Sequence, residues 1–359
     1  MSDFRNLRAL CLAVLGRPPV GIDWAGVVSL ANRALLTPAL AATVASLPAE
    51  TRPPEAVSAF LAEVMARNRE RNRRLSAQLE EIVQMLASVE VECTLLKGAA
   101  FLAEPGPQAD RRIISDLDVL LAASDLERGG TALEQAGFQV SARYPEGDSH
   151  VAMEMFRESD VGAIDLHRRP PGPRQVMFST LLAERSTRTP FGAGHVRIPT
   201  AEVRILHLAM HDQFHDGDFW SGALDLRHLL DIAALAARDP DWDLLSPRLL
   251  GGLCYRALCR ELIDAHELFE ANLPPSFRAN LGGELHHRRA MLQLRWPAVR
   301  GGFSLLTLLA EAPAGFGHYR REWRFRAASG ISTVSSRQRA LGRMARLRDT
   351  FNERPISKI

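Results

Sequence analysis

Residues 111–121 read Arg111-Arg112-Ile113-Ile114-Ser115-Asp116-Leu117-Asp118-Val119-Leu120-Leu121. The branched, apolar composition from Ile113 onward predicts a strand. Side chains two residues apart on a strand share a face, so Asp116 and Asp118 lie side by side. Two carboxylates so close repel each other, and a divalent cation with a preference for oxygen ligands is the usual remedy. Paired Asp residues also occur in plain turns, but the apolar run behind this pair favours a metal site.

A third carboxylate follows in a second alternating segment, Ala163-Ile164-Asp165-Leu166-His167. Asp165 and His167 share one face of this predicted strand. If the two strands are neighbours, Asp165 converges with the earlier Asp pair, and three carboxylates can hold two metal ions. The alternative is an Asp at a strand end that forms a surface salt bridge.

The turn before the first of these strands carries Leu96-Lys97-Gly98-Ala99-Ala100. Gly98 lets backbone N–H groups approach a phosphate, and Lys97 offers a compact positive charge to the same group. Of the 44 basic residues only Lys97 and Lys358 are lysine, so the internal position is one where arginine does not substitute freely. A lone Lys-Gly pair is also common in ordinary turns.

The chain divides into three predicted parts. Residues 1–90 are helical, with Pro53-Pro54 opening a helix from Glu55 to about Val89. Residues 91–199 form an α/β or α+β unit, and residues 200–359 return to helices. Strands are expected at 91–96, 113–121, 138–142, 151–157, 161–166 and 196–198, with 151–157 and 161–166 as a hairpin. Helices are expected at 99–104, 124–136 (capped by Ser124 and Gly137), 200–215, 224–237, 249–270, 290–294 and 303–309.

Composition narrows the class of partner and location. With 46% hydrophobic and 24% charged residues the chain is globular. Its net charge of +2 argues against nucleic acid as a partner, and the run Arg67–Arg74 is better interpreted as a solvated helix face than as a phosphate contact. No apolar run reaches the roughly 18 residues of a membrane span, and the first residues do not resemble a signal peptide. Four cysteines without a CxxC pair indicate free thiols, so we expect a cytoplasmic protein.

Several histidines are candidate ligands or substrate contacts. His207, His211 and His215 recur every four residues and so share a helix face, which is a zinc-ligand spacing. The pair His211-Asp212 is similar to a metal phosphohydrolase motif, which needs further ligands from other helices. We expect His207 and His211 to contact nucleotide or acceptor, with a purely structural helix face as the competing interpretation. His150 is either a substrate or phosphate contact or a plain loop histidine.

These segments, in their order, resemble a known family. Leu95–Gly98, Arg112, Ser115–Leu120, Leu133 to Phe138, His150 and Ile164–His167 together resemble the uncharacterised nucleotidyltransferase family of the DNA polymerase β-like superfamily. The resemblance extends over residues 20–270 and includes His207–His211, Leu224–Asp231 and Trp242.

The resemblance implies an α+β fold, with a polymerase β-like mixed sheet and flanking helices between the two helical regions. It implies that Asp116, Asp118 and Asp165 bind Mg²⁺ or Mn²⁺, and that Asp165 also acts as or orients the general base. Phosphate contacts are implied for Lys97, Gly98, Arg112, Ser115, His150 and His167. Ala99 stands where better-known branches have serine, which removes a hydroxyl contact to phosphate.

The leading hypothesis is a metal-dependent nucleotidyltransferase. It would move a nucleoside monophosphate, by default AMP from ATP, to a hydroxyl-type acceptor on a small molecule, peptide or protein, and release pyrophosphate. The alternative is a non-catalytic nucleotide- or peptide-binding partner with the same fold. If the chain is only a binding partner, the three aspartate carboxylates should point apart. If it is an enzyme, they should converge. A third option places a phosphohydrolase metal on His207 and His211.

Overall fold

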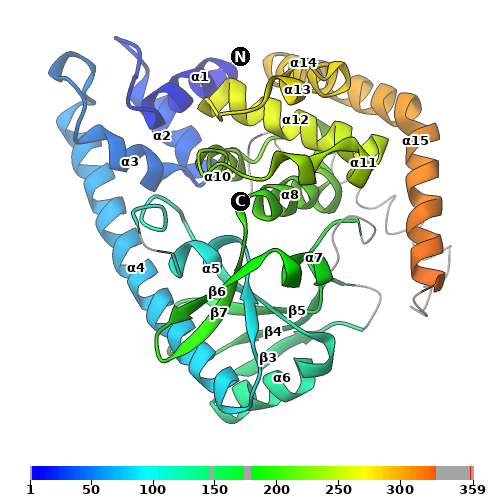
Figure 1. Ribbon diagram of the computed structural model, residues 1–359. Helices are drawn as coiled ribbons and strands as arrows, with labels where there is room; N and C mark the ends of the chain where they lie inside the picture. The colour runs from blue at the N-terminus through cyan, green and yellow to red at the C-terminus, as the bar shows by residue number, and fades with distance from the viewer. Residues whose placement is uncertain (1, 105, 146–148, 174–178, 329–355, 357–359) are drawn as a thin grey trace.

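The computed structural model describes residues 2–104, 106–145, 149–173, 179–328 and 356 (Figure 1). The strands are β1 Cys93–Leu95, β2 Asp116–Leu121, β3 Gln139–Arg143, β4 Val151–Phe156, β5 Ala163–His167, β6 Ser186–Phe191 and β7 Gly194–Pro199. The helices before and within the sheet region are α1 Ser2–Val14, α2 Trp24–Arg33, α3 Thr37–Val44, α4 Glu55–Ser88, α5 Lys97–Leu102, α6 Leu126–Gln135 and α7 Ser179–Glu184. The later helices are α8 Ala201–Met210, the π-helical turn η3 His211–Asp216, α9 Asp218–Ser221, α10 Leu226–Ala236, α11 Pro247–Leu250, α12 Gly252–Phe269, α13 Pro275–Arg278, α14 Leu281–Arg295 and α15 Arg300–Ala328.

The strands form one seven-stranded sheet in the order β3-β4-β5-β2-β1-β7-β6. β2 lies near its centre, parallel to β5 and antiparallel to β1, while β4 and β5 form the predicted antiparallel hairpin. Parallel and antiparallel pairs in one sheet make it mixed. The predicted α+β class, a mixed sheet with flanking helices, is confirmed.

The long helix α4 ties the sheet to the helical part of the molecule. It begins after Pro54, and the leucine and isoleucine face from Leu75 to Leu86 is buried against the sheet. Asn68 and Asn72 donate side-chain hydrogen bonds to carbonyls of residues 109–112, just before β2. These bonds satisfy backbone groups that the loop leaves unpaired, so α4 fixes where β2 starts.

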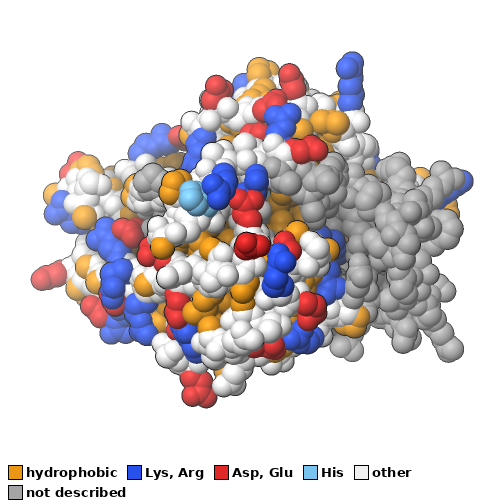
Figure 2. All heavy atoms as spheres, turned by 60° about the horizontal axis from the view of Figure 1, so that its bottom comes forward, with side chains coloured by type: hydrophobic (Ala, Val, Ile, Leu, Met, Phe, Trp, Pro, Cys, Tyr) orange, Lys and Arg blue, Asp and Glu red, His pale blue; other side chains and the backbone are white. Residues whose placement is uncertain are grey.

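The arginine run on α4 has partners on its own helix and on neighbouring segments. Arg67 and Arg73 pair with glutamates of the same helix, at 2.6 and 2.8 Å. Arg71 donates to the carbonyls of Ser115 and Val161 at 3.2 and 3.0 Å. On the face shown in Figure 2, Lys and Arg side chains lie among Asp and Glu side chains. The run is therefore a largely solvated helix face, from which Arg69 also pairs with Asp110 at 3.1 Å and Arg71 reaches the backbone before two strands.

Two large hydrophobic cores and a small third cluster around Phe219 occur in the described part of the chain. One joins the sheet with α4 and α6. The other joins α1–α3 with α8, α10, α12 and α14, so the two helical regions at opposite ends of the sequence pack together (Figure 1). The boundaries 1–90, 91–199 and 200–359 remain a prediction about the chain, while in space the first and third parts share a core.

Some local predictions were wrong. Ser124 does not cap a helix: residues 123–125 form a 3₁₀ turn, α6 begins at Leu126, and no side-chain cap bond is made. The strand β6 was missed because its sequence, Ser-Thr-Arg-Thr-Pro-Phe, is polar and lies at the sheet edge. The helix expected at 303–309 is longer and includes Pro313. The arginine-rich end beyond Ala328, apart from Ile356, lies outside the described residues.

The structure also bears on the cysteines and on membrane-spanning segments. All four cysteines are buried free thiols. Among the helices that the structure describes, none is both long and apolar enough to cross a bilayer.

Replacing Leu79 with alanine tests the packing of α4 on the sheet. Leu79 is fully buried, so Leu79→Ala should lower the free energy of unfolding by about 2–5 kcal/mol in urea denaturation. Phe60→Ala is the control, because Phe60 lies on the same helix and is 43% exposed. Equal losses for the two variants would contradict this packing.

Candidate active site

A row of carboxylates crosses three adjacent strands. Asp118 on β2 pairs in register with Asp165 on β5, and Asp165 pairs with Glu154 on β4. Residues paired across strands point to the same face. Ligand atoms of Asp118, Asp165 and His167 lie within 4.8 Å of one another. The strands predicted to be neighbours are neighbours, and two of the three predicted carboxylates converge.

Glu154 was missed by the sequence analysis. Its signal was available, since β4 alternates as Val-Ala-Met-Glu-Met-Phe and the hairpin pairing was predicted. The hydroxyl of Tyr144 donates to Glu154 at 2.7 Å, which holds that carboxylate in place.

The two facing aspartates have opposite proton affinities. Burial, together with the nearby negative charges of Asp118 and Asp116, raises the pKa of Asp165 to about 7. For Asp118 burial also acts to raise the pKa, but the Lys97 ammonium and His167 outweigh it and hold the pKa well below its usual range. Lys97 Nζ lies 3.0 Å and His167 Nε2 2.9 Å from Asp118 Oδ1. The pair thus combines an ionised carboxylate with one that holds a proton near neutrality.

Lys97 and Gly98 begin α5, directly beside β2. Lys97 has a φ of +41°, in the left-handed region that side chains other than glycine rarely adopt. Its ammonium is directed to Asp118, one of the predicted metal ligands. A Cβ on Gly98 would meet Arg112 Nη1 at 2.7 Å and Ile114 Cγ2 at 2.9 Å. Gly98 therefore has a packing reason to be glycine that does not depend on phosphate.

The remaining predicted residues of this segment have separate partners. Arg112 is buried and pairs with Asp231 of α10 at 2.8 Å, so it joins the sheet region to the helical region. Ser115 Oγ donates to Asp116 Oδ1 at 2.9 Å. Asp116 is beside Asp118 on the same strand face but belongs to none of the ligand groups with atoms within 4.8 Å among the described residues.

A file of imidazole rings connects the sheet to the helices. His167 is 5.2 Å from His150, His150 is 4.6 Å from His215, and His215 is 4.9 Å from His211, measured between ring centroids. Burial lowers the pKa of both His150 and His167. His150 and His167 are therefore neutral at pH 7. The sequence did not indicate that His150 belongs to a row of imidazole rings.

His207 and His211 differ despite sharing a helix face. His207 is buried and lines a void of about 10 Å³ with Leu96 and Lys97, which is space for about one water. Its Nε2 has no hydrogen-bond partner in the structure, and burial holds its pKa well below the usual range. His211 is 3.3 Å from both Asp212 and Asp216. The contact to nucleotide or acceptor predicted for these two histidines remains a prediction.

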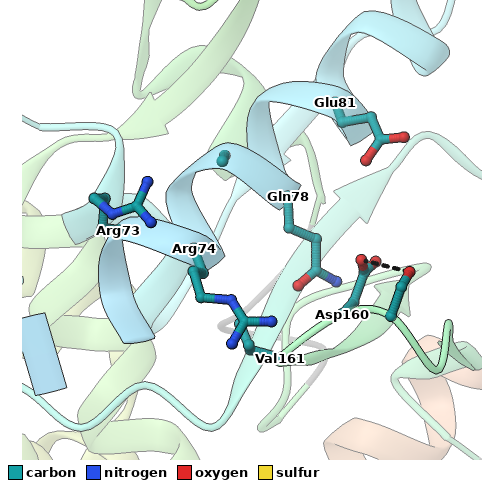
Figure 3. Close-up of a pocket in the computed structure, with 8 residues that line it drawn as sticks. Arg73, Arg74, Gln78, Glu81, Asp160 and Val161 are labelled. Atoms are coloured by element: carbon teal, nitrogen blue, oxygen red, sulfur yellow. Dashed lines mark hydrogen bonds between the residues drawn. The ribbon is translucent and has the colours of Figure 1, made fainter. Parts of the chain in front are cut away.

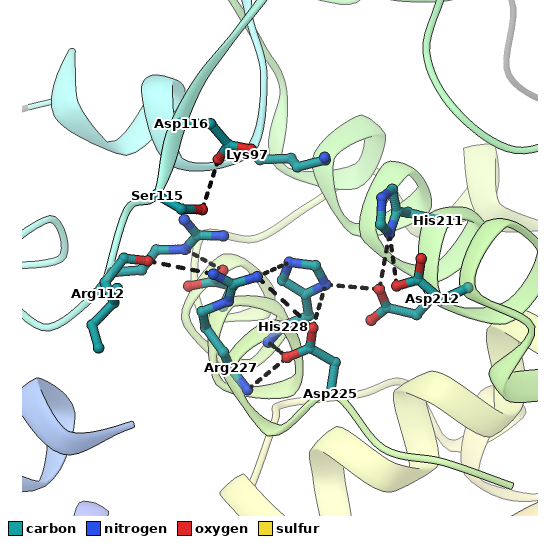
Figure 4. A network of polar contacts seen from close by, with 12 residues as sticks. Lys97, Arg112, Ser115, Asp116, His211, Asp212, Asp225, Arg227 and His228 are labelled. Atoms are coloured by element: carbon teal, nitrogen blue, oxygen red, sulfur yellow. Dashed lines mark hydrogen bonds and ion pairs between the residues drawn. The ribbon is translucent and has the colours of Figure 1, made fainter. Parts of the chain in front are cut away.

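A second polar network, which the sequence indicated only in part, centres on His228 (Figure 4). His228 Nδ1 is 2.8 Å from Asp212 Oδ1 and 3.3 Å from Asp225 Oδ2. Asp225 also caps α10 by accepting from the backbone N–H groups of Arg227 and His228. Asp225 and His228 stand three residues apart at a helix start, which was the available signal.

A separate pocket of about 250 Å³ lies where α4 meets the turn between β4 and β5 (Figure 3). Arg73, Arg74 and Gln78 line it together with Glu81 and Asp160. Those two carboxylates pair with Arg157. The pocket holds none of the predicted site residues.

The donor set of the sheet site fits a divalent cation. Asp118, Asp165 and His167 supply two carboxylates and an imidazole at ligand spacing, and Asp116 lies next along the strand. Burial, and after it the repulsion from Asp118, Asp116 and Glu154, raises the pKa of Asp165 although Lys97 lies nearby. A cation bound there would relieve this repulsion.

Facing carboxylates on parallel strands beside a lysine-glycine turn are the arrangement that the resemblance to a nucleotidyltransferase implies. The family model described as "Uncharacterised nucleotidyltransferase" matches residues 21–270, and the chain belongs to this family. The resemblance predicted from the ordered motifs is therefore confirmed, and so is the assignment as a transferase enzyme. No protein with a curated description matches the sequence significantly.

Solved structures with distant similarity carry related names. The solution structure of the antibiotic-resistance factor ANT(2'')-Ia is 12% identical, with 60% of this chain and 98% of that chain covered and a TM-score of 0.29. An antigenic nucleotidyltransferase-like protein from Paracoccidioides brasiliensis is 14% identical, with 58% and 98% covered and a TM-score of 0.38. ANT(2'')-Ia with adenylyl-2''-tobramycin is 13% identical, with 57% and 97% covered and a TM-score of 0.27. At such scores the likeness adds nothing to the site's geometry.

The pKa of Asp165 predicts a pH-dependent stability in the absence of metal. Between about pH 4 and 7 the unfolded chain loses a proton that folded Asp165 retains, so stability falls as pH rises through this window. Asp165→Asn removes this titration. In thermal melts with a chelator, the melting temperature of the variant relative to wild type should rise from pH 5 to pH 7.5. A constant difference across this range would contradict the assignment.

Replacing Lys97 tests its role as the counter-ion of Asp118. Lys97→Met leaves the Asp118 carboxylate buried without its cation, and loss of one partner of a buried pair typically costs about 3–5 kcal/mol. Mg²⁺ should restore part of this loss by binding the uncompensated carboxylate. Arg185→Met is the control, because its ion pair with Asp241 is about half exposed and contributes at most about 1 kcal/mol. A Lys97→Met protein as stable as wild type would contradict the role.

Proposed function

We propose that the chain is a metal-dependent enzyme that transfers a nucleoside monophosphate, by default AMP from ATP, to a hydroxyl-type acceptor. The acceptor is a hydroxyl on a small molecule, a peptide or a protein. The observation that carries the proposal is the parallel register of β2 and β5, which sets Asp118 opposite Asp165. Family membership supports nucleotidyl transfer as the reaction.

In this proposal Asp116, Asp118 and Asp165 hold Mg²⁺ or Mn²⁺. When bound, the cation supplies positive charge to the triphosphate and to the acceptor oxygen. Lys97 is close enough to Asp118 to move from this carboxylate to a phosphate oxygen when the cation takes its place. Arg112 is committed to Asp231, so Lys97 is the stronger phosphate candidate of the two.

The reaction balances with groups of this chain. The acceptor hydroxyl oxygen forms a bond to the α-phosphorus, and the bond from that phosphorus to the bridging oxygen breaks, so pyrophosphate leaves. The hydroxyl proton passes to the carboxylate of Asp165, or to a base that Asp165 orients. Glu154 lies opposite Asp165 on the neighbouring strand and is itself held by the Tyr144 hydroxyl.

A non-catalytic nucleotide- or peptide-binding partner is the second candidate. The ion pair of Lys97 with Asp118 favours this second candidate, since the ammonium group neutralises a predicted metal ligand without a metal ion. Burial of Ala99 where other branches have serine points the same way. The two candidates differ in whether nucleotide binding needs a divalent cation and whether pyrophosphate is released.

Isothermal titration with ATP, GTP, CTP and UTP, with and without Mg²⁺, tests the proposal. Wild type should bind at least one nucleotide in a Mg²⁺-dependent manner, and Asp165→Asn should weaken this binding by about tenfold or more. Glu158→Gln, an exposed change in the turn of the same hairpin, should bind like wild type. Pyrophosphate release with pooled hydroxyl acceptors then separates enzyme from binder. Mg²⁺-independent binding without pyrophosphate release would support a nucleotide-binding partner. No binding of any of the four nucleotides would contradict the transferase and favour a peptide-binding partner.

A further inference from the structure

A second group of metal-type ligands lies on the helical side of the sheet site. His211 and Asp212 belong to the turn η3, and His228 belongs to the first turn of α10. Ligand atoms of these three residues lie within 4.8 Å of one another. Figure 4 shows His211 and His228 both directed at Asp212, apart from Lys97 and Asp116.

The contacts converge on one carboxylate oxygen. Asp212 Oδ1 is 2.8 Å from His228 Nδ1 and 3.3 Å from His211 Nδ1. His228 Nδ1 also faces Asp225 Oδ2 at 3.3 Å. A neutral imidazole carries one proton, and that proton cannot serve two carboxylates equally well. A divalent cation, in contrast, accepts the imidazole nitrogens and the carboxylate together.

The backbone and the burial of this group are those of a built site. The π-helical turn η3 continues α8, and π turns are rare and are found frequently at functional sites. Asp212 is fully buried, the His228 side chain is 2% exposed and the His211 side chain 13%. A ligand set with one accessible member leaves an approach for an ion while the other two are held rigidly.

We propose that His211, Asp212 and His228 bind one divalent transition cation of the Zn²⁺ class, separate from the cation of the nucleotidyl-transfer carboxylates. Two imidazoles and a carboxylate are the ligands of a borderline cation, whereas Mg²⁺ prefers oxygen alone. His215 and Asp216 form another group with His211. The set with His228 is preferred because two of its three members are buried and it joins two separate helical elements.

Co²⁺ titration followed by visible absorption tests this site in protein without an affinity tag. The Asp165→Asn background weakens the sheet site with the smallest change in charge, because Asp165 holds a proton near neutrality. One equivalent of Co²⁺ should bind and be displaced by Zn²⁺. His228→Gln should weaken Co²⁺ binding by more than about tenfold, while His195→Gln, an exposed histidine of β7, should have no effect. Equal binding by the His228→Gln protein, or loss in His215→Gln instead, would overturn the assignment.

A second measurement tests the site without the His228→Gln variant, which matters if that variant fails to fold. Pulsed electron paramagnetic resonance of Cu²⁺ bound to the Asp165→Asn protein counts the coordinated imidazoles. Two imidazoles are expected from His211 and His228, whereas the sheet site offers only His167. One imidazole or none would overturn the proposal. Either result leaves the nucleotide-binding test of the sheet site unaffected, since that test depends on Mg²⁺ and the three aspartates.

Discussion

The pairing of β2 with β5 is the constraint on which the rest of the site depends. In that parallel register Asp118 faces Asp165, and both are largely withdrawn from water. Bringing two carboxylates together in this way is costly unless positive charge or a proton compensates. The structure uses both, with Lys97 on Asp118 and a raised pKa on Asp165. In the proposed function a divalent cation takes the place of the Asp165 proton and of the Lys97 ammonium group beside Asp118.

The surrounding architecture holds this register in place. α4 donates side-chain amides to the loop before β2, and Arg71 reaches the backbone ahead of both β2 and β5. From the other side Arg112 pairs with Asp231, which locks α10 over the start of β2. The file of histidine rings from His167 to His211 continues the contact between sheet and helices. Helical regions from both ends of the chain thus act as one support for the sheet.

The sequence predicted the parts of this structure that follow from local periodicity. Alternation identified Asp118 and Asp165 on their strands, and a proline followed by helical spacing identified α4 almost to its ends. The polar edge strand β6 and the true start of α6 were missed, because edge pairing and a 3₁₀ turn leave weak patterns. The partnership of Arg112 with Asp231 spans more than a hundred residues, so no local pattern reveals it. Glu154 required knowledge of the register between β4 and β5, which depends on a bulge in their pairing.

The central claim is that the facing carboxylates of β2 and β5 hold the catalytic cation. A crystal structure with Mn²⁺ and a non-hydrolysable ATP analogue, recorded at a wavelength where manganese scatters anomalously, tests it most directly. The account predicts an anomalous peak between Asp118 and Asp165, about 2.0–2.3 Å from their oxygens, with Lys97 displaced from Asp118 towards phosphate. Nucleotide bound with no peak at these carboxylates, and Lys97 still paired with Asp118, would contradict it.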